Sequence, residues 1–264
     1  MDRPAYCLIT GASRGLGRHF AHALAARKRN LVLVARSLDQ LESLANELRA
    51  VHAVQAQPLG FDLSGPLAGQ RLAEQLRERD LSIDLLVNNA GFGLRGEFWK
   101  LSLDHQLEML RLHHAGLVEL TFHLLPSMIA ERRGGIINVS STAAFQPIPY
   151  AAAYAASKAF ATSFSLALAE ELRPYGVTVV TVCPGRLRPD SPIDNGAKPR
   201  RALMGVVEQS REQVVTEALK ALDRHGGLVI PGVINKSVAF AERLIPRSVI
   251  AKLVARLSRP GPAS

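Results

Sequence analysis

Three side chains near the middle of the sequence could together move a proton to or from a carbonyl oxygen. Tyr154 and Lys158 are four residues apart in an alanine-rich helical stretch, so they share one face about one turn apart. Ser141 precedes the tyrosine by 13 residues and stands where an apolar strand pattern ends. An ammonium beside a phenol favours the phenolate and brings its pKa down from about 10. This set of groups therefore suits acid–base chemistry on a carbonyl.

The surrounding sequence alternates between apolar stretches and helical patterns, which would position these side chains. We expect strands over Ala5–Thr10, Asn30–Ala35, Ala53–Leu59, Ile83–Asn88, Ile136–Ser140, Val177–Cys183 and Leu228–Ile230. We expect helices over Leu16–Lys28, Leu38–Ala50, Leu67–Arg79, Ser102–Arg133, Tyr154–Arg173 and Ser210–Arg224. Apolar strands that alternate with helices predict a parallel sheet covered on both faces. The predicted fold class is α/β, a single doubly wound domain over residues 1–264 with about seven mainly parallel strands.

Two of the expected helices begin with the sequence form of a capping box. These starts are Ser37-Leu-Asp-Gln40 and Ser210-Arg-Glu-Gln213. In such a box the serine hydroxyl accepts a hydrogen bond from a backbone N–H of the first turn. We therefore expect both serines to cap their helices.

A glycine-rich turn joins the first expected strand to the first expected helix. Its sequence, Thr10-Gly-Ala-Ser-Arg-Gly-Leu-Gly17, places glycines at positions 11, 15 and 17. Such glycines let the backbone approach a pyrophosphate, and the amino end of the following helix offers unpaired N–H groups to the anion. A plain tight turn would explain the same residues, but its position in the chain favours dinucleotide binding.

The residues after the second strand indicate which dinucleotide this would be. A site for NAD usually has an acidic residue there, which holds the ribose 2′-hydroxyl. This sequence has Arg36 instead, and Arg14 lies within the glycine-rich turn. Two guanidiniums can bind a 2′-phosphate by charge-assisted hydrogen bonds, which predicts NADP, with NADPH preferred over NADH. The alternative is that Arg36 is only a solvated residue at the end of a strand.

Two further strand ends could contact the cofactor. Asp62 follows the third strand and could accept a hydrogen bond from the adenine amino group or cap the next turn. The sequence favours neither role. Asn88-Asn-Ala-Gly91 closes the fourth strand, where small residues would let the chain run beside the cofactor ribose and amides would tie neighbouring strands.

The motifs resemble those of the short-chain dehydrogenase/reductase family in order and spacing, from Ala5 to about Ile230. The resemblance is carried by Thr10–Gly17, Asn88–Gly91, Ser141, Tyr154 with Lys158, and Pro184-Gly185. It implies a Rossmann-type sheet, a nicotinamide cofactor and hydride transfer to or from a small-molecule carbonyl or alcohol. It also implies that Tyr154 is the acid/base, Lys158 its activator and Ser141 the group that holds the carbonyl. The expected cofactor contacts are Gly11, Ser13, Arg14, Gly15, Leu16, Gly17, Arg36, Asp62, Leu63, Asn89, Ala90, Gly91, Tyr154, Lys158, Pro184 and Gly185.

Two positions depart from the family pattern. In the helix after Asn89 the family usually has an asparagine three residues before a glycine, which completes a proton relay to the lysine. Alignment on Gly116 puts His113 there, and an imidazole can relay protons. We therefore expect His113 to act as a fourth catalytic residue or to mark a slower or altered enzyme. Pro189 stands where the family often has a threonine that contacts the nicotinamide carboxamide.

The overall composition restricts the class of protein. The 264 residues are 47% apolar and 21% charged, which is typical of a globular domain. Cys7 and Cys183 lie in apolar stretches, which favours packed thiols in a reducing cytoplasm over a disulfide. No signal peptide and no stretch long enough to span a bilayer is apparent, so we expect a cytoplasmic protein. His19 and His22 have no companion acids or thiols, so no metal site is predicted.

The net charge of +9 comes mostly from the last quarter of the chain. Residues 1–195 contain 20 basic and 18 acidic residues, whereas residues 196–264 contain 12 and 5. Residues 233–258 form a basic amphipathic helical extension broken near Pro246. It could pack over a lid or partner subunit, contact an anionic membrane, or dock an acidic carrier protein or coenzyme A substrate. Basic residues without interleaved aromatics or a known module argue against nucleic acid.

The segment 186–207 is rich in proline, glycine and charge and lacks clean periodicity. It follows the sixth strand at the ligand edge, so we expect a substrate lid. An apolar wall for a nonpolar ketone, aldehyde or acyl chain could come from Phe92, Phe145, Pro147, Ile148, Leu203 and Met204. Core packing would explain these apolar residues equally well.

Two main functional hypotheses follow. The first is an NADPH-dependent carbonyl reductase, which at a membrane surface could act on lipids. The second is a non-catalytic dinucleotide-binding sensor or scaffold protein. The alanine-rich helix between Ala151 and Ala169 allows close helix approach and predicts a homodimer or homotetramer.

Overall fold

One parallel sheet forms the centre of the protein. The computed structural model describes residues 4–188 and 208–258. Within these residues seven strands pair in the order β3-β2-β1-β4-β5-β6-β7, and every neighbouring pair is parallel. They are β1 (Ala5–Thr10), β2 (Asn30–Ala35), β3 (Ala56–Gly60), β4 (Ser82–Asn88), β5 (Gly134–Val139), β6 (Val177–Val182) and β7 (Gly227–Val229). The chain reverses its direction across the sheet between β1 and β4, where such folds bind ligands at the carboxyl ends of the strands.

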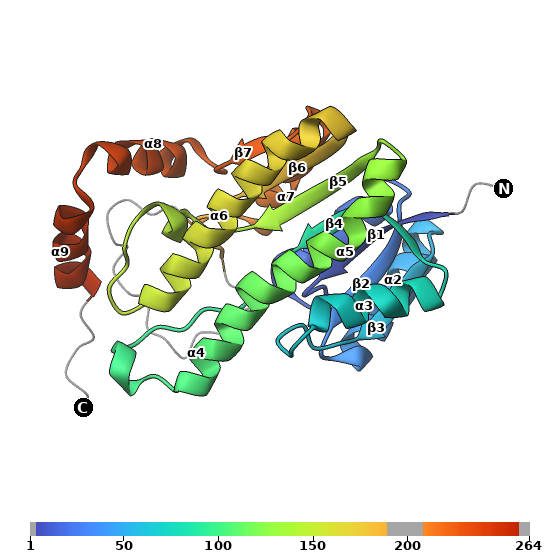
Figure 1. The fold of residues 1–264 in the computed structure, drawn as a ribbon, viewed down its shortest axis with the longest axis horizontal. Coiled ribbons are helices and arrows are strands. Elements are labelled where there is room, and N and C mark those ends of the chain that lie inside the picture. Colours follow the sequence, from blue (N-terminus) through green and yellow to red (C-terminus); the bar gives the residue numbers. More distant parts are fainter. Residues whose placement is uncertain (1–3, 189–207, 259–264) are drawn as a thin grey trace.

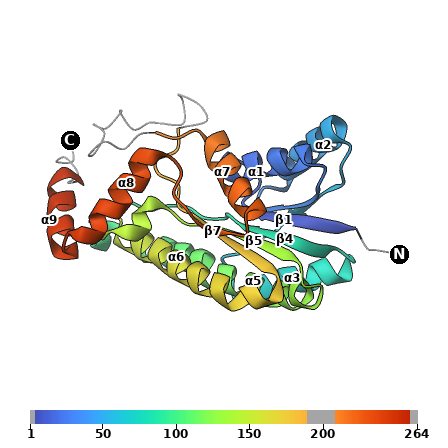
Figure 2. The same ribbon diagram turned by 90° about the horizontal axis from the view of Figure 1, so that it is seen from above.

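Helices cover both faces of the sheet (Figures 1 and 2). One face carries α1 (Gly15–Ala26), α2 (Leu38–His52) and α7 (Arg211–Asp223). The other carries α3 (Ala68–Glu78), α5 (Leu117–Ala130) and α6 (Ala152–Leu172), and α4 (Leu103–Leu110) leads into α5. This arrangement confirms the predicted doubly wound α/β fold.

The sheet buries apolar side chains on both faces because successive residues of a strand point to opposite sides. In β1, Cys7 and Ile9 join the core beneath α1, α2 and α7, whereas Tyr6 and Leu8 join the core beneath α3, α5 and α6. Strands with two buried faces must be apolar throughout, which is the pattern seen in the sequence. Cys7 and Cys183 are both buried and free, as expected.

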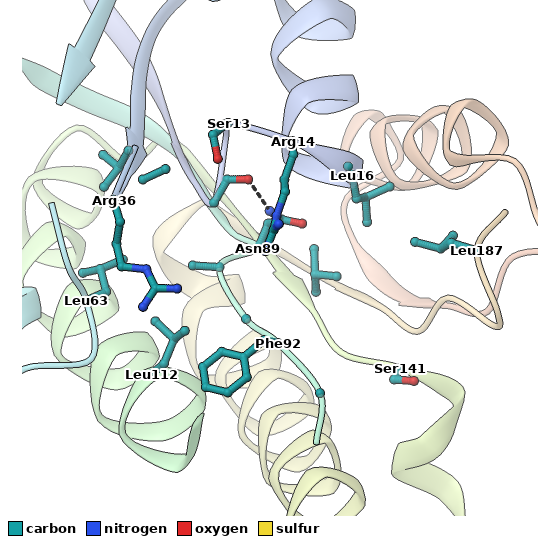
Figure 3. A pocket seen from close by; sticks show the side chains of 18 of the residues that line it. Ser13, Arg14, Leu16, Arg36, Leu63, Asn89, Phe92, Leu112, Ser141 and Leu187 are labelled. Atoms are coloured by element: carbon teal, nitrogen blue, oxygen red, sulfur yellow. Dashed lines mark hydrogen bonds between the residues drawn. The ribbon is translucent and has the colours of Figure 1, made fainter. Parts of the chain in front are cut away.

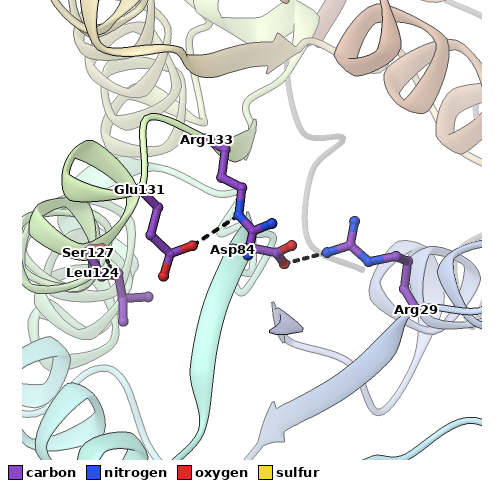
Figure 4. Close-up of polar contacts among 6 residues, drawn as sticks. All are labelled: Arg29, Asp84, Leu124, Ser127, Glu131 and Arg133. Carbon is purple, nitrogen blue, oxygen red and sulfur yellow. Dashed lines mark hydrogen bonds and ion pairs between the residues drawn. The ribbon is translucent and has the colours of Figure 1, made fainter. Parts of the chain in front are cut away.

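Charged side chains hold the turns at the amino-terminal edge of the sheet, opposite the ligand edge (Figure 4). Arg29, just before β2, forms an ion pair with Asp84 near the start of β4. Just before β5, the Arg133 Nε donates to Glu131 Oε2 over 3.0 Å. The first contact ties the start of β2 to β4, across the intervening β1, and the second lies within the turn before β5. The role of both is structural.

The expected helix Ser102–Arg133 is divided in the structure. After α4 the chain makes a π-helical segment, Arg111–Gly116, and α5 follows. A Cβ on Gly116 would lie 2.9 Å from the carbonyl oxygen of Leu63, so this glycine lets the segment pack against the turn after β3. π-Helical segments are rare and often occur at functional sites.

Only one of the two expected serine caps forms. Ser210 Oγ accepts a hydrogen bond from the Gln213 N–H over 3.1 Å at the start of α7. Ser37 precedes α2 as predicted, but its side chain makes no capping bond. The Ser37 backbone has ψ 91°, well below the ψ 144° of Ser210, so the first-turn N–H groups of α2 lie differently relative to the serine side chain.

The last of the described residues form a pair of helices that lie apart from the sheet (Figures 1 and 2). They are α8 (Val233–Ala241) and α9 (Arg247–Ser258), joined through the 3₁₀ turn η6 (Glu242–Leu244). The expected break near Pro246 is confirmed. Within the described residues no helix is both long and apolar enough to cross a membrane. Most of the expected lid, 189–207, lies outside the described residues.

Candidate active site

A cleft of about 570 Å³ lies at the carboxyl edge of the sheet, where the turns after β1 to β6 meet. Figure 3 shows Arg36, Leu63, Leu112 and Phe92 on one side of it and Leu187 and Ser141 on the other. The predicted site residues that line this cleft are Gly11, Ser13, Arg14, Gly15, Leu16, Arg36, Asp62, Leu63, Asn89, Ala90, Gly91, Ser141, Tyr154, Lys158, Pro184 and Gly185. Gly17 and His113 do not line it. The sequence thus identified most of the cleft.

The glycine-rich turn approaches the turn after β4 closely. Gly11 has φ +65°, and a Cβ there would lie 2.9 Å from the Ala90 Cα. A Cβ on Gly17 would lie 2.2 Å from the Gly11 carbonyl oxygen and 2.6 Å from Asn89 Nδ2. Asn89 Nδ2 itself donates to the carbonyl oxygens of Thr10 and Gly11. Gly17 therefore supports the cleft from behind and has a packing role.

The start of α1 offers free hydrogen-bond donors to the cleft. Its N-cap residue, Arg14, makes no side-chain cap, and its first turn contains no acidic residue. The first N–H groups of a helix lack partners within the helix and carry a partial positive charge. The cleft volume, the glycine turn and these donors together fit the pyrophosphate of a dinucleotide.

The two predicted arginines both line the cleft, but Arg36 already has an anionic neighbour. The Arg36 Nη1 lies 2.9 Å from Glu108 Oε1, which reaches the cleft from α4. Glu108 is separated from Arg36 by 72 residues, so nothing in the sequence indicated this pair. Asp62 Oδ1 accepts hydrogen bonds from the Ser64 N–H and hydroxyl, which lower the pKa of Asp62 against the raising effect of its burial. Asp62 therefore caps this turn, and because it also lines the cleft, its contact with the adenine amino group stays a prediction.

The predicted serine, tyrosine and lysine gather at one side of the cleft. The side chains of Ser141 and Tyr154 are hydrogen-bonded to each other. Lys158 Nζ lies 5.9 Å from the centre of the Tyr154 ring and donates to the Val139 carbonyl oxygen over 3.0 Å. Ser141 Oγ also accepts from the Ala143 N–H over 3.1 Å, which fixes the loop after β5. A phenol, a hydroxyl and an ammonium thus lie within reach of a common substrate atom.

Burial controls the proton affinities of these groups. It lowers the pKa of Lys158 to about 8, because the low-polarity surroundings disfavour the ammonium. Burial also raises the pKa of Tyr154, and the hydrogen bond with Ser141 only partly opposes this. Desolvation of the phenolate dominates in this structure, and the expected lowering of the tyrosine pKa by Lys158 together with an oxidised nicotinamide stays a prediction. At neutral pH Tyr154 keeps its proton.

His113 is buried behind the cleft and connects to Tyr154 through a serine. Its Nδ1 lies 2.8 Å from Ser157 Oγ, and Ser157 donates its hydroxyl hydrogen to the Tyr154 carbonyl oxygen over 2.7 Å. Because that hydrogen is used, the His113 Nδ1 must be the donor to Ser157. Burial, with smaller repulsion from Lys158 and His114, lowers the pKa of His113 to about 2. The ring is thus neutral, with Nε2 as an acceptor.

A second, small cavity of about 20 Å³ separates His113 from Lys158. Its other walls include Thr10, Asn88 and Val139. A cavity needs about 10–15 Å³ to hold one water, so this one has room for a single molecule. His113 Nε2 makes no hydrogen bond with any described residue, so it is an acceptor that such a water could satisfy.

The expected apolar wall is only partly at the cleft. Phe92 lines it, whereas Phe145, Pro147 and Ile148 do not. Leu203, Met204 and Pro189 lie outside the described residues. Sequence reasoning also missed Leu112 and Leu187, which line the cleft as apolar residues. Their helix and loop positions carry no motif that could have identified them.

The described residues contain no cluster of three or more histidines, cysteines or carboxylates that could hold a metal ion.

A family model described as short chain dehydrogenase matches residues 5–199. The chain is 30% identical over 267 residues to "Dehydrogenase/reductase SDR family member 7B" of Xenopus tropicalis, covering 97% of this chain and 86% of that protein.

Solved structures of proteins with related sequences have the same fold as this chain. A 7beta-hydroxysteroid dehydrogenase superposes with a TM-score of 0.85 at 25% identity, with 96% of each chain covered. A short-chain dehydrogenase from Sphingobium yanoikuyae in complex with NADPH superposes with a TM-score of 0.79 at 29% identity, with 98% of each chain covered.

Proposed function

Because this chain belongs to the short-chain dehydrogenase/reductase family of NAD(P)-dependent oxidoreductases, we propose that it uses NADPH to reduce an apolar ketone, aldehyde or acyl carbonyl. The gathering of the Ser141, Tyr154 and Lys158 side chains at one side of a dinucleotide-sized cleft carries this proposal. A bound nicotinamide would supply the hydride. The chain itself supplies the proton and the hydrogen bonds to the carbonyl oxygen.

Each of the three side chains has a role that its surroundings support. Tyr154 has a raised pKa, so it holds the proton that a reduced carbonyl oxygen must receive. Ser141 is held by the Ala143 N–H and would donate to the same oxygen as negative charge develops there. Lys158, charged below about pH 8, would stabilise the phenolate left after the transfer.

The preference for NADPH rests on the cations at the cleft. Arg14 and Arg36 both line it, and a 2′-phosphate beside Arg36 would replace Glu108 as its anionic partner. We expect an Arg36→Ala variant to lose about tenfold in kcat/KM with NADPH and little with NADH. Equal use of NADPH and NADH by the unaltered protein would refute the preference.

We also propose that His113 takes part in a proton relay to Lys158. The support is the neutral ring, its free Nε2 and the water-sized cavity that it shares with Lys158. His113→Leu removes both nitrogens, so we expect kcat to fall about tenfold or more. His113→Asn keeps an amide that can bond to Ser157 and should recover part of the rate. Unchanged kcat in both variants would leave His113 as a tolerated helix residue.

The apolar substrate class is supported by Phe92, Leu112 and Leu187 on the cleft and by the structural likeness to a hydroxysteroid dehydrogenase. A screen of NADPH consumption against ketones, aldehydes and 3-oxoacyl substrates, graded from polar to bulky and apolar, tests this class. Tyr154→Phe separates an enzyme from a sensor or scaffold. Cofactor binding with no turnover on any substrate, and no effect of that variant, would refute the reductase.

We further propose a cytoplasmic homodimer or homotetramer that uses the outer surface of α5 and α6. These two helices run side by side (Figure 1), and Phe122, Phe160 and Leu166 are exposed on them. Light scattering of the purified protein gives the oligomeric state, and Phe122→Ser should lower the fraction of oligomer.

The buried thiols fit a reducing compartment, and cell fractionation tests the location.

A further inference from the structure

The two carboxy-terminal helices expose an unusual amount of apolar surface. Of the twenty large apolar side chains that are exposed in the described chain, nine lie between residues 233 and 257. They are Val233, Ile234, Val238, Phe240, Leu244, Ile245, Val249, Leu253 and Leu257. Figures 1 and 2 place α8 and α9 at one end of the molecule, with α9 beyond the end of the sheet. Concentrated exposed apolar surface of this kind marks an interaction site.

Helix α9 separates a packed side from an exposed apolar side. Residues four apart share a helix face, so Ile250 and Val254 form the buried side. Val249, Leu253 and Leu257 lie next to it as a continuous exposed row. Lys252 and Arg256, four residues apart, are also exposed and border that row on its other side. The result is an apolar strip edged with positive charge.

Helix α8 repeats this arrangement. Asn235 and Ala239 are buried, Ile234 and Val238 form an exposed row beside them, and Val233 is exposed on the far side of the helix. Lys236 is exposed between the two sides. Both helices therefore combine a packed side with an unpartnered apolar side.

The charge of this region is strongly one-sided. Residues 233–258 contain Lys236, Arg243, Arg247, Lys252 and Arg256 but a single acid, Glu242. Burial raises the pKa of Glu242 to about 7, so even this carboxylate is only partly ionised at neutral pH. The region therefore attracts anions.

A cavity of about 460 Å³ between α7, β7 and α8 adds to this charge. Lys220, Arg224 and Lys236 line it together with one acid, Glu217, and its walls include Leu228 and Phe240. Among the described residues none of these three cations takes part in an ion pair. An anionic group with an apolar tail would match both the cations and the walls.

We propose that α8 and α9 dock on a bilayer rich in anionic phospholipid, lying in the plane of its surface. The apolar rows enter the boundary between headgroups and acyl chains, and the lysines and arginines face the headgroup phosphates. A second copy of the chain fits less well, because a two-fold interface would bring together two surfaces with the same net positive charge. The docking does not depend on the proposed reductase activity.

The test uses the full-length protein and sedimenting vesicles of phosphatidylcholine alone or with about one third phosphatidylserine. We expect binding only to the anionic vesicles, and release when the salt concentration shortens the range of charge attraction. Lys252→Gln with Arg256→Gln should weaken binding about 30-fold, at about 1 kcal/mol for each basic residue. Arg77→Gln with Arg79→Gln, two exposed arginines at the end of α3, is the matched control and should bind normally.

A second variant tests the apolar row. Val249→Ser, Leu253→Ser and Leu257→Ser together should abolish vesicle binding, whereas Leu38→Ser, Val51→Ser and Leu67→Ser should leave it intact. All six side chains are exposed, so both triple variants should keep the wild-type melting temperature. The proposal fails if the unaltered protein stays in solution with both kinds of vesicle or if the α9 variants bind like their controls. It also fails if the α9 row proves to hold a dimer together, or to bind an acidic acyl carrier protein, without any vesicle binding.

Discussion

The buried histidine behind the cleft makes the stability of the protein sensitive to acid. His113 is only 3% exposed, and burial lowers its pKa to about 2. In the unfolded chain the ring has an ordinary pKa near 6.5 and takes up a proton below that pH. The folded protein does not take up this proton until far lower pH. Between about pH 6.5 and 2 the unfolded state therefore binds one more proton, and stability falls as the pH falls.

The size of this loss of stability follows from the lowered pKa of His113. Each pH unit below 6.5 costs about 1.4 kcal/mol in the free energy of unfolding, so about 2 kcal/mol is lost between pH 7.5 and pH 5. A typical domain has only about 5–15 kcal/mol in total. His113→Asn removes the titrating ring and should remove this loss. The pKa values of His22 and His114 are also lowered, but both are present in the variant, so the difference between the two proteins isolates His113.

Urea unfolding at several pH values between about 7.5 and 5 measures the difference. Between these pH values the free energy of unfolding of the unaltered protein should fall by about 2 kcal/mol more than that of His113→Asn, whatever the difference between the two at pH 7.5. His105→Asn, at an exposed position of α4, is the control and should follow the unaltered protein. Parallel pH dependences for the unaltered protein and His113→Asn would show that the ring is not held neutral. They would also refute the assignment of Nε2 as a hydrogen-bond acceptor.

Three further outcomes are expected. Tyr154→Phe should lower kcat by about 10²–10⁴ while NADPH binding, followed by fluorescence, stays the same; normal turnover would exclude the tyrosine as the proton donor. Glu108→Gln should tighten NADPH binding about two- to fivefold relative to NADH, because the partly exposed pair with Arg36 is lost; an unchanged ratio would place the 2′-phosphate elsewhere. The kcat for reduction should fall as the pH rises through about 8, because Lys158 then loses its charge, and a flat profile to pH 10 would contradict this assignment.

The strands and the ligand edge could be predicted because their signals are local. The bounds of β1 and β2 match the predicted Ala5–Thr10 and Asn30–Ala35. A strand buried on both faces must be apolar along its whole length, so its sequence reveals it. The order of strands then brings the turns after them to one edge, and the glycine turn, Ser141 and Tyr154 all reached the predicted cleft.

Contacts between distant segments were not predictable from the sequence. Glu108 reaches Arg36 from α4, and Ser157 joins His113 to the Tyr154 backbone. Each of these contacts depends on how two distant segments pack together, and no local sequence pattern predicts that packing. The raised pKa of Tyr154 was missed for the same reason, since the degree of burial follows from the packed structure and the residue types alone do not give it.

The glycine-rich turn was given two interpretations, a plain tight turn and a dinucleotide-binding site. Its glycines, with Gly91 after β4, show that the two go together. A Cβ on Gly17 would strike the Gly11 carbonyl oxygen whether or not a ligand were bound, and a Cβ on Gly91 would lie 2.6 Å from His113 Nε2. These glycines are thus required by the packing of three turns against one another. The same close packing leaves the N–H groups of α1 open to an anion and brings the Asn89 amide onto the Gly11 carbonyl. The tight turn is therefore the means by which the site is built, and a substitution at Gly17 should disrupt folding and cofactor binding together.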